Sequence, residues 1–161
     1  MLRFVPGSEA LFRRVAASNR RAARTVEIPT RYQDRVRAYA AGHPDDGRVL
    51  LDALERRPDF HRDGWIMRLQ PRAAAMTLGT DVFLRRDITL RRYVHELVHV
   101  YQYGSMGTLP FLEAYFGGAA RELLLRMVQR RALDPMTASP LEAEAYDIDR
   151  RFTAWERQAS T

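Results

Sequence analysis

The sequence is organised around Thr89–Gly104, which reads TLRRYVHELVHVYQYG and contains the pentapeptide HELVH at positions 95–99. Apolar residues recur in this stretch at steps of three and four, the spacing of one buried face of an α-helix. Residues four apart on a helix lie on the same side, with about 5–6 Å between their Cβ atoms. We therefore expect a helix that places His95 and His99 next to each other.

On a helix, H-E-x-x-H is the signature of zinc metallopeptidases. His95 and His99 would supply two imidazole ligands, and a catalytic zinc site needs a third protein ligand and one open position. Glu96 is placed to act as the general base, which takes a proton from water and passes it to the leaving amine. The alternatives are a helix with two buried structural histidines and an inactive zinc fold. Two of the four histidines of the chain fall in this pentapeptide, which favours the metal site.

A second helix near the C-terminus is expected to supply the third zinc ligand. Ser139 followed by Pro140 is a strong helix start, with Ser as the cap and Pro in the first turn. Glu142 and Glu144 are the two candidates, and they point about 200° apart around the helix, so one of them at most faces the metal. Glu142 has another explanation, because Ser139-x-x-Glu142 is also a capping box, in which Glu142 bonds to the Ser139 amide.

Tyr146, one helical turn beyond Glu142, is the best-placed donor for the oxyanion of a tetrahedral intermediate. Tyr101, Tyr103 and Arg150 are weaker candidates for the same task. Packing in the core is the alternative explanation for any one of these tyrosines.

The pattern predicts an α+β fold: a mainly helical, zincin-like domain with a small β-sheet beside the H-E-x-x-H helix. We expect one domain over residues 1–161, with a helical N-terminal region at 1–62 and the metal-binding core at 63–158. Strands are predicted at 65–70, 76–79 and 81–85, the last two joined by a turn at Gly79-Thr80. Helices are predicted at 1–26, 29–41, 45–57, 89–104, 119–133 and 139–155. Ser8 can cap the first, Asp45 or Asp46 the third and Asp87 or Thr89 the fourth, which Gly104 ends. His43 and His61 are expected in loops.

The chain has no cysteine, so a zinc ion would have to be held by histidine and carboxylate. All of the 26 basic residues are arginine and the net charge is +6, but the arginines are scattered in pairs, so a solvated surface is favoured over nucleic-acid binding. No run approaches the ~20 apolar residues of a membrane helix. We see no signal peptide, and the expected location is open: soluble, and either cytoplasmic or exported by a non-classical route.

Residues 64–150 resemble the zincin-like DUF4157 family, which is associated with extracellular contractile injection systems. The resemblance rests on AMTLG at 75–79, VFL at 82–84, HELVHVYQ at 95–102 and EAEA at 142–145. It implies His95, His99 and Glu142 as ligands of Zn²⁺, Glu96 as the catalytic base, a peptide or protein as substrate, and injection-system components as partners. Related peptidases often follow E-x-E-A with an acid that orients a zinc-bound histidine, whereas this chain has Tyr146. Asp147 or a backbone carbonyl is expected to take over that task.

Overall fold

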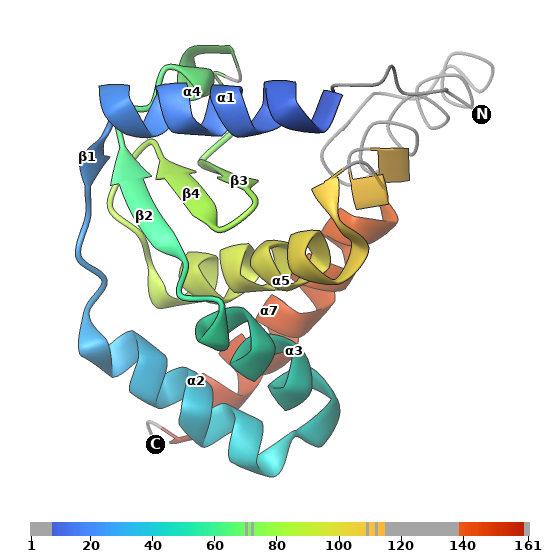
Figure 1. The fold of residues 1–161 in the computed structure, drawn as a ribbon. Coiled ribbons are helices and arrows are strands. Elements are labelled where there is room, and N and C mark those ends of the chain that lie inside the picture. The colour runs from blue at the N-terminus through green and yellow to red at the C-terminus, as the bar shows by residue number, and fades with distance from the viewer. Residues whose placement is uncertain are drawn as a thin grey trace, which may run out of the picture.

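The computed structural model describes residues 8–69, 71, 73–108, 110–111, 113–114 and 139–159. The predicted helix at 119–133 lies outside these residues. The described chain is a mixed α+β structure with a small sheet of four strands (Figure 1). Its elements, in chain order, are α1 Ser8–Ala22, β1 Arg24–Thr25, α2 Thr30–Gly42, α3 Pro44–Glu55, β2 Asp59–Arg62, α4 Ile66–Leu69, β3 Ala75–Leu78, β4 Asp81–Leu84, α5 Leu90–Met106 and α7 Pro140–Ala159.

The sheet has the strand order β1-β2-β4-β3. β3 and β4 form the predicted hairpin, and Gly79 in its turn adopts φ +69°, a left-handed conformation that glycine enters without steric cost. β2 pairs with β4 in parallel, and β1 pairs with β2 antiparallel. The region before residue 63, predicted to be helical, therefore contributes two strands to the sheet. β3 forms the edge of the sheet that faces α5.

Side chains alternate between the two faces of the sheet along each strand, and each face packs against other parts of the chain. Val82 and Leu84 of β4 join the main core with residues of α5, whereas Phe83 between them packs with residues near α1 and α4. Figure 1 shows α1 and α5 on opposite sides of the strands. The approach of the chain to Phe83 is close: a Cβ on Gly64 would lie 2.6 Å from the Phe83 ring. α5 thus lies between the sheet on one side and α3 and α7 on the other.

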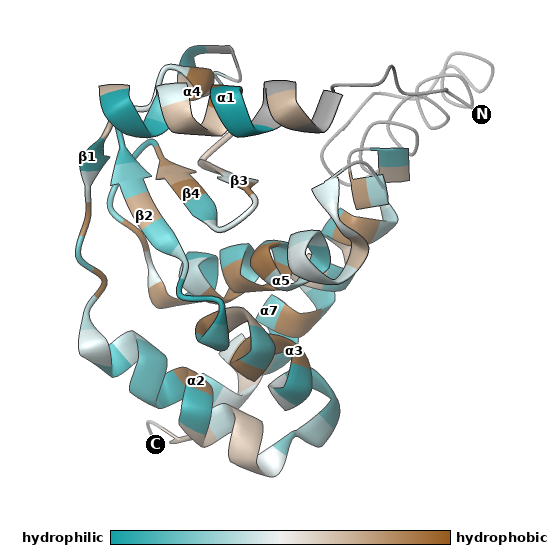
Figure 2. Cartoon of the chain, in the orientation of Figure 1, coloured by the Kyte–Doolittle hydropathy of each residue, from teal (hydrophilic) through white to brown (hydrophobic). Residues whose placement is uncertain are grey.

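α5 is the central element of the core. Val94, Leu97 and Val98 are fully buried and pack with residues of α7 and α3. Ala145 of α7 is also fully buried, and its small side chain lets α7 lie close to α5, as we expected for two helices that share an ion. Figure 2 shows hydrophobic colour on α5, α7 and α3 where they meet, whereas α2 is largely hydrophilic. None of the helices in the described part of the chain is both long and apolar enough to cross a bilayer.

The predicted strand at 65–70 is wrong, since residues 66–69 form α4. The run WIMRL has the composition of a strand, but the side chain of Asn19 in α1 accepts a hydrogen bond from the Ile66 amide and caps a helical turn there. A residue 47 positions away thus decides the local structure. The strand lies one segment earlier, in β2, which includes the buried His61, so the expectation of a loop at His61 is also wrong.

Three predicted helix ends also shift. α5 begins as predicted, with the Thr89 hydroxyl accepting from the Arg92 amide, but it runs past Gly104 and stops at Gly107, where φ is +78°. The side chain of Arg56 lies against Gly104, which remains exposed. α3 starts at Pro44, before the predicted aspartate caps, because Pro is well suited to the first helical turn. α1 ends at Ala22 rather than near residue 26, where the chain enters β1.

Candidate metal centre

His95, His99 and Glu142 converge at one point between α5 and α7. The two histidines stand one turn apart on α5, and Glu142 reaches them from the first turn of α7. Their ligand atoms lie close enough together to hold a metal ion, and all three residues are buried. Glu144, the other candidate, is not a member of this group. The capping-box alternative for Glu142 is wrong as well, because its carboxylate faces the imidazoles.

The distances between the ligand atoms fit a tetrahedral ion. The Nε2 atoms of His95 and His99 are 3.2 Å apart. Nε2 of His95 lies 3.3 Å from Glu142 Oε2, and Nε2 of His99 lies 3.4 Å from Oε1. Zinc bonds of about 2.0–2.1 Å at tetrahedral angles separate two ligand atoms by about 3.3–3.4 Å. Glu142 Oε2 is buried and has no hydrogen-bond partner among the described residues, as expected of an atom directed at an ion rather than at a donor.

Asp149 fixes the orientation of His95. Its Oδ2 lies 3.3 Å from Nδ1 of His95, a contact that favours a hydrogen on this nitrogen and directs Nε2 toward His99 and Glu142. The other oxygen of Asp149 accepts from Arg91, with Nη2 at 3.1 Å. Asp147, which we expected in this position, is exposed and pairs with Arg150 instead. Asp149 follows Glu142 by seven residues, two helical turns, so the spacing contained this signal.

Gln102 fixes the orientation of His99. Its Oε1 lies 2.8 Å from Nδ1 of His99, while its Nε2 donates to Glu144 at 2.8 Å and to the Leu141 carbonyl at 3.0 Å. Two acceptors on one side of the amide determine which end is the oxygen. The oxygen therefore accepts from Nδ1 of His99, and Nε2 of His99 is left bare. Glu144 thus acts on the site through Gln102 rather than as a ligand.

The Nε2 atoms of the two histidines and the Glu142 carboxylate face one another, and this arrangement requires a cation between them. Burial lowers the pKa of His95, but the carboxylates of Asp149 and Glu142 beside the ring outweigh it and raise the pKa to about 9. Burial raises the pKa of Glu142, but the two imidazoles outweigh it and hold the pKa far below its ordinary value. Both directions show that positive charge between these side chains is favoured, whether a proton or a metal ion supplies it.

Glu96 lies beside this centre and is held by a neighbouring strand. Thr77 of β3 donates to Glu96 Oε2 at 2.9 Å, and Arg92 lies one turn earlier with Nη1 3.8 Å from Oε1. The carboxylate is buried. Glu96 is not part of the ligand group, in agreement with a separate function for it. Thr77 was missed by the sequence analysis, because nothing in the local pattern pairs a strand threonine with a helix glutamate 19 residues later.

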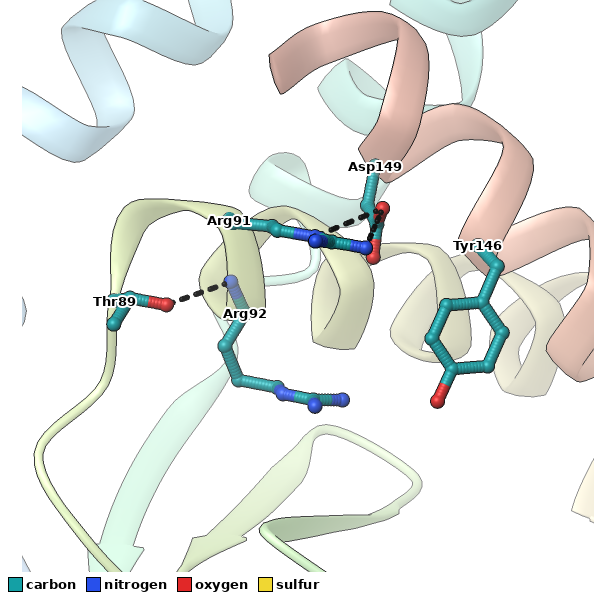
Figure 3. A pocket seen from close by; sticks show the side chains of 5 residues that line it. All are labelled: Thr89, Arg91, Arg92, Tyr146 and Asp149. Atoms are coloured by element: carbon teal, nitrogen blue, oxygen red, sulfur yellow. Dashed lines mark hydrogen bonds and ion pairs between the residues drawn. The ribbon is translucent and has the colours of Figure 1, made fainter.

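Tyr146 lies against the metal centre from α7. Its ring centroid is 4.7 Å from that of His95, and the side chain lines a pocket together with Thr89, Arg91, Arg92 and Asp149. Figure 3 shows the hydroxyl at the end of a side chain that extends from α7 into this open space. Tyr103, a weaker candidate, is buried and stacked on Phe111 with 3.7 Å between ring centroids, so it packs in the core.

Comparisons with protein-family models, with curated proteins and with solved structures found no match for this chain. The function must therefore be argued from the chemistry of the centre itself.

Proposed function

We propose that this chain is a zinc-dependent metallopeptidase of zincin type. The observation that carries the proposal is the convergence of His95 Nε2, His99 Nε2 and Glu142 at separations of 3.2–3.4 Å, with Glu96 of the same H-E-x-x-H helix beside them. Three neutral or anionic nitrogen and oxygen ligands with one position left over are the donor set of catalytic zinc. The orienting contacts from Asp149 and Gln102 add support, since such partners are usual around zinc-bound histidines.

The site residues divide the work of peptide hydrolysis. Zinc bound here would act as a Lewis acid that makes water nucleophilic near neutral pH and polarises the substrate carbonyl. Glu96, kept in place by Thr77, accepts the proton of the attacking water and passes it to the leaving amine. Tyr146 donates from its hydroxyl to the oxyanion of the tetrahedral intermediate, which lowers the barrier by stabilising charge that develops there.

The position of β3 supports a peptide as the substrate. β3 is the edge strand of the sheet, it runs beside α5, and its Thr77 contacts Glu96. An edge strand has backbone donors and acceptors that pair with an extended peptide, which places the scissile carbonyl near the catalytic helix. The zincin fold and the relation to the DUF4157 family, with injection-system components as partners, are part of the same proposal.

The decisive experiment compares zinc content and hydrolysis in the wild type and in Glu96→Gln. We expect one zinc per chain in both proteins, peptide cleavage by the wild type that a chelator abolishes, and a loss of at least about 100-fold in Glu96→Gln, the lower range for a general base. Undiminished turnover in this variant would reject Glu96 as the base. Zinc binding without cleavage of any peptide in a diverse mixture would instead indicate a binding module built on this fold.

A further inference from the structure

A pocket next to the metal centre contains an arginine, Arg92, that has no function in the proposed hydrolysis. It has a volume of about 220 Å³ and is lined by Thr89, Arg91, Arg92, Tyr146 and Asp149. We call it the Arg92 pocket. Pockets that enclose whole small molecules measure about 300–1,000 Å³, so this one has the size for a single side chain. Its lining comes from the start of α5 and the middle of α7.

The Arg92 pocket shares a wall with the metal centre. Tyr146 lines the pocket, and its ring lies 4.7 Å from the ring of His95. Asp149 also lines the pocket, and its Oδ2 is 3.3 Å from Nδ1 of His95. A group in the pocket is therefore separated from the ligand His95 by one layer of side chains. For a substrate bound at the metal, that group belongs to a residue next to the scissile bond.

The two arginines of the pocket are engaged to different degrees. Arg91 binds Asp149 through Nε at 3.2 Å and Nη2 at 3.1 Å, so its charge is balanced within the wall. Among the residues that the structure describes, Arg92 reaches an acid only at Glu96, with 3.8 Å between Nη1 and Oε1, which is too long for a hydrogen bond. Figure 3 shows the guanidinium of Arg92 and the hydroxyl of Tyr146 pointing into the same space. Arg92 is thus the cation with donors left for a bound group.

From this arrangement we infer that the Arg92 pocket binds a carboxylate of the substrate, so that peptides with an acidic group next to the scissile bond are preferred. The inference rests on the proposed function for the position of the substrate. A planar guanidinium matches the two oxygens of a carboxylate, whereas the single hydrogen of the Tyr146 hydroxyl stays assigned to the oxyanion. An acidic side chain and a free C-terminal carboxylate have this chemistry in common.

The test uses pairs of acetylated and amidated fluorescent hexapeptides that differ in one Glu or Gln at each position in turn. Binding is measured by anisotropy to zinc-loaded Glu96→Gln, and cleavage is measured with the wild type. We expect one position at which Glu is preferred over Gln by about 10- to 100-fold, the range for a charge-assisted hydrogen bond. A third peptide, with Gln throughout and a free C-terminus, distinguishes a terminal carboxylate from a side chain.

Arg92→Gln should reduce the Glu-to-Gln ratio to about one, and Arg92→Lys should keep part of it, because the charge remains while the fork is lost. The ratio is the informative quantity, since any effect of Arg92 on Glu96 applies equally to both peptides. Arg37→Gln is the matched control: Arg37 is an exposed arginine of α2 that pairs with Asp34 at 3.9 Å. It should leave the ratio unchanged.

Equal binding of Glu and Gln peptides at every position, with no gain from a free C-terminus, would overturn the pocket assignment even if peptides are cleaved. Preferential binding of the acidic peptide that depends on Arg92, without cleavage, would support the pocket and reject the peptidase. The failures of the two proposals are therefore distinguishable.

Discussion

Two polar clusters join the helices in the described part of this protein, one fully buried and one with an exposed arginine, and they differ in how their charges are balanced. The ligand cluster, His95, His99 and Glu142, lies between α5 and α7. The Asp46 cluster, Tyr39, Asp46 and Arg151, joins α2, α3 and α7. In the second cluster every acceptor has a donor: Tyr39 donates its hydroxyl to Asp46 at 2.6 Å, and Arg151 binds both carboxylate oxygens at 2.7 and 2.8 Å.

The ligand cluster lacks this balance. Its Nε2 atoms and its carboxylate face one another, and within the described part of the chain Glu142 Oε2 has no hydrogen-bond partner. Buried polar groups without partners cost about 1–3 kcal/mol each, so a chain that only needed to join two helices gains nothing from this arrangement. The contrast favours a structural function for the Asp46 cluster and supports the proposal that the ligand cluster holds an ion.

Removal of a proposed ligand should have the largest effect on zinc binding, so it is the strongest test of the contrast between the two clusters. In Glu142→Gln we expect zinc affinity to fall by at least about 100-fold, because even the loss of an outer partner costs about 10- to 100-fold. Zinc should also stabilise the wild type by about 4 kcal/mol at 1,000 times Kd, which raises Tm on the order of 10 °C. Isothermal titration and thermal melts with and without zinc measure both effects.

Asp46→Asn is the control from the other cluster. It should bind zinc like the wild type and show the same rise in Tm on zinc addition. Equal zinc affinity in Glu142→Gln and Asp46→Asn would show that the convergence at the ligand cluster is not a metal site.

The orienting contacts come next in size. Gln102→Leu removes the acceptor for Nδ1 of His99, and Asp149→Asn weakens the acceptor for Nδ1 of His95. Each variant should lose about 10- to 100-fold in zinc affinity while keeping the fold. Competition with a chromophoric chelator gives the affinities, and circular dichroism checks the fold. Wild-type affinity in both variants would mean that the imidazoles are oriented by backbone packing alone.

Substitution in the Asp46 cluster should change the stability of the fold rather than the affinity for zinc. Asp46→Asn keeps the shape of the side chain but removes the charge that Arg151 binds, and we expect a loss of about 1–2 kcal/mol in the free energy of unfolding. Asp34→Asn, which removes an exposed acid 3.9 Å from Arg37, should cost less than about 0.5 kcal/mol. Urea unfolding of both variants gives the difference. Equal losses would mean that the Asp46 cluster is no more than a surface ion pair.

The same two clusters show how far the sequence could be interpreted. The proposed ligands could be named in advance because local patterns place them: H-E-x-x-H defines one face of α5, and Ser139-Pro140 fixes the start of α7. The choice of Glu142 over Glu144 rested on the family resemblance. The Asp46 cluster was not predictable, because it joins residues up to 105 positions apart whose local patterns are those of ordinary helix surfaces. Asp46 itself was expected to be a helix cap.

The incorrect predictions in and around the sheet have the same cause. The β3–β4 hairpin was predicted from alternation and a glycine turn, both of which are local. The parallel pairing of β2 with β4 and the helical turn of α4 depend on distant partners, among them Asn19, and no local signal announces them. The orienting residue Asp149 is an intermediate case, because its spacing from Glu142 was visible, but the choice between Asp147 and Asp149 needed the direction of α7 relative to α5.

The smallest expected effect is the pH dependence of the stability that the Asp46 cluster contributes. Hydrogen bonding to Arg151 lowers the pKa of Asp46 below its ordinary value, against the opposing effect of burial. A carboxyl with a lower pKa in the folded state contributes stability that is fully present above the unfolded-state pKa of about 3.9 and is lost as the pH falls through the folded-state pKa. The difference in stability between wild type and Asp46→Asn should therefore be constant from about pH 7 to pH 5 and shrink below about pH 4. Urea unfolding across this range, with chelator present so that zinc does not contribute, measures it. A difference that stays constant down to pH 3 would mean that Asp46 acts through shape and not through charge. Charge balance would then no longer distinguish the Asp46 cluster from the ligand cluster.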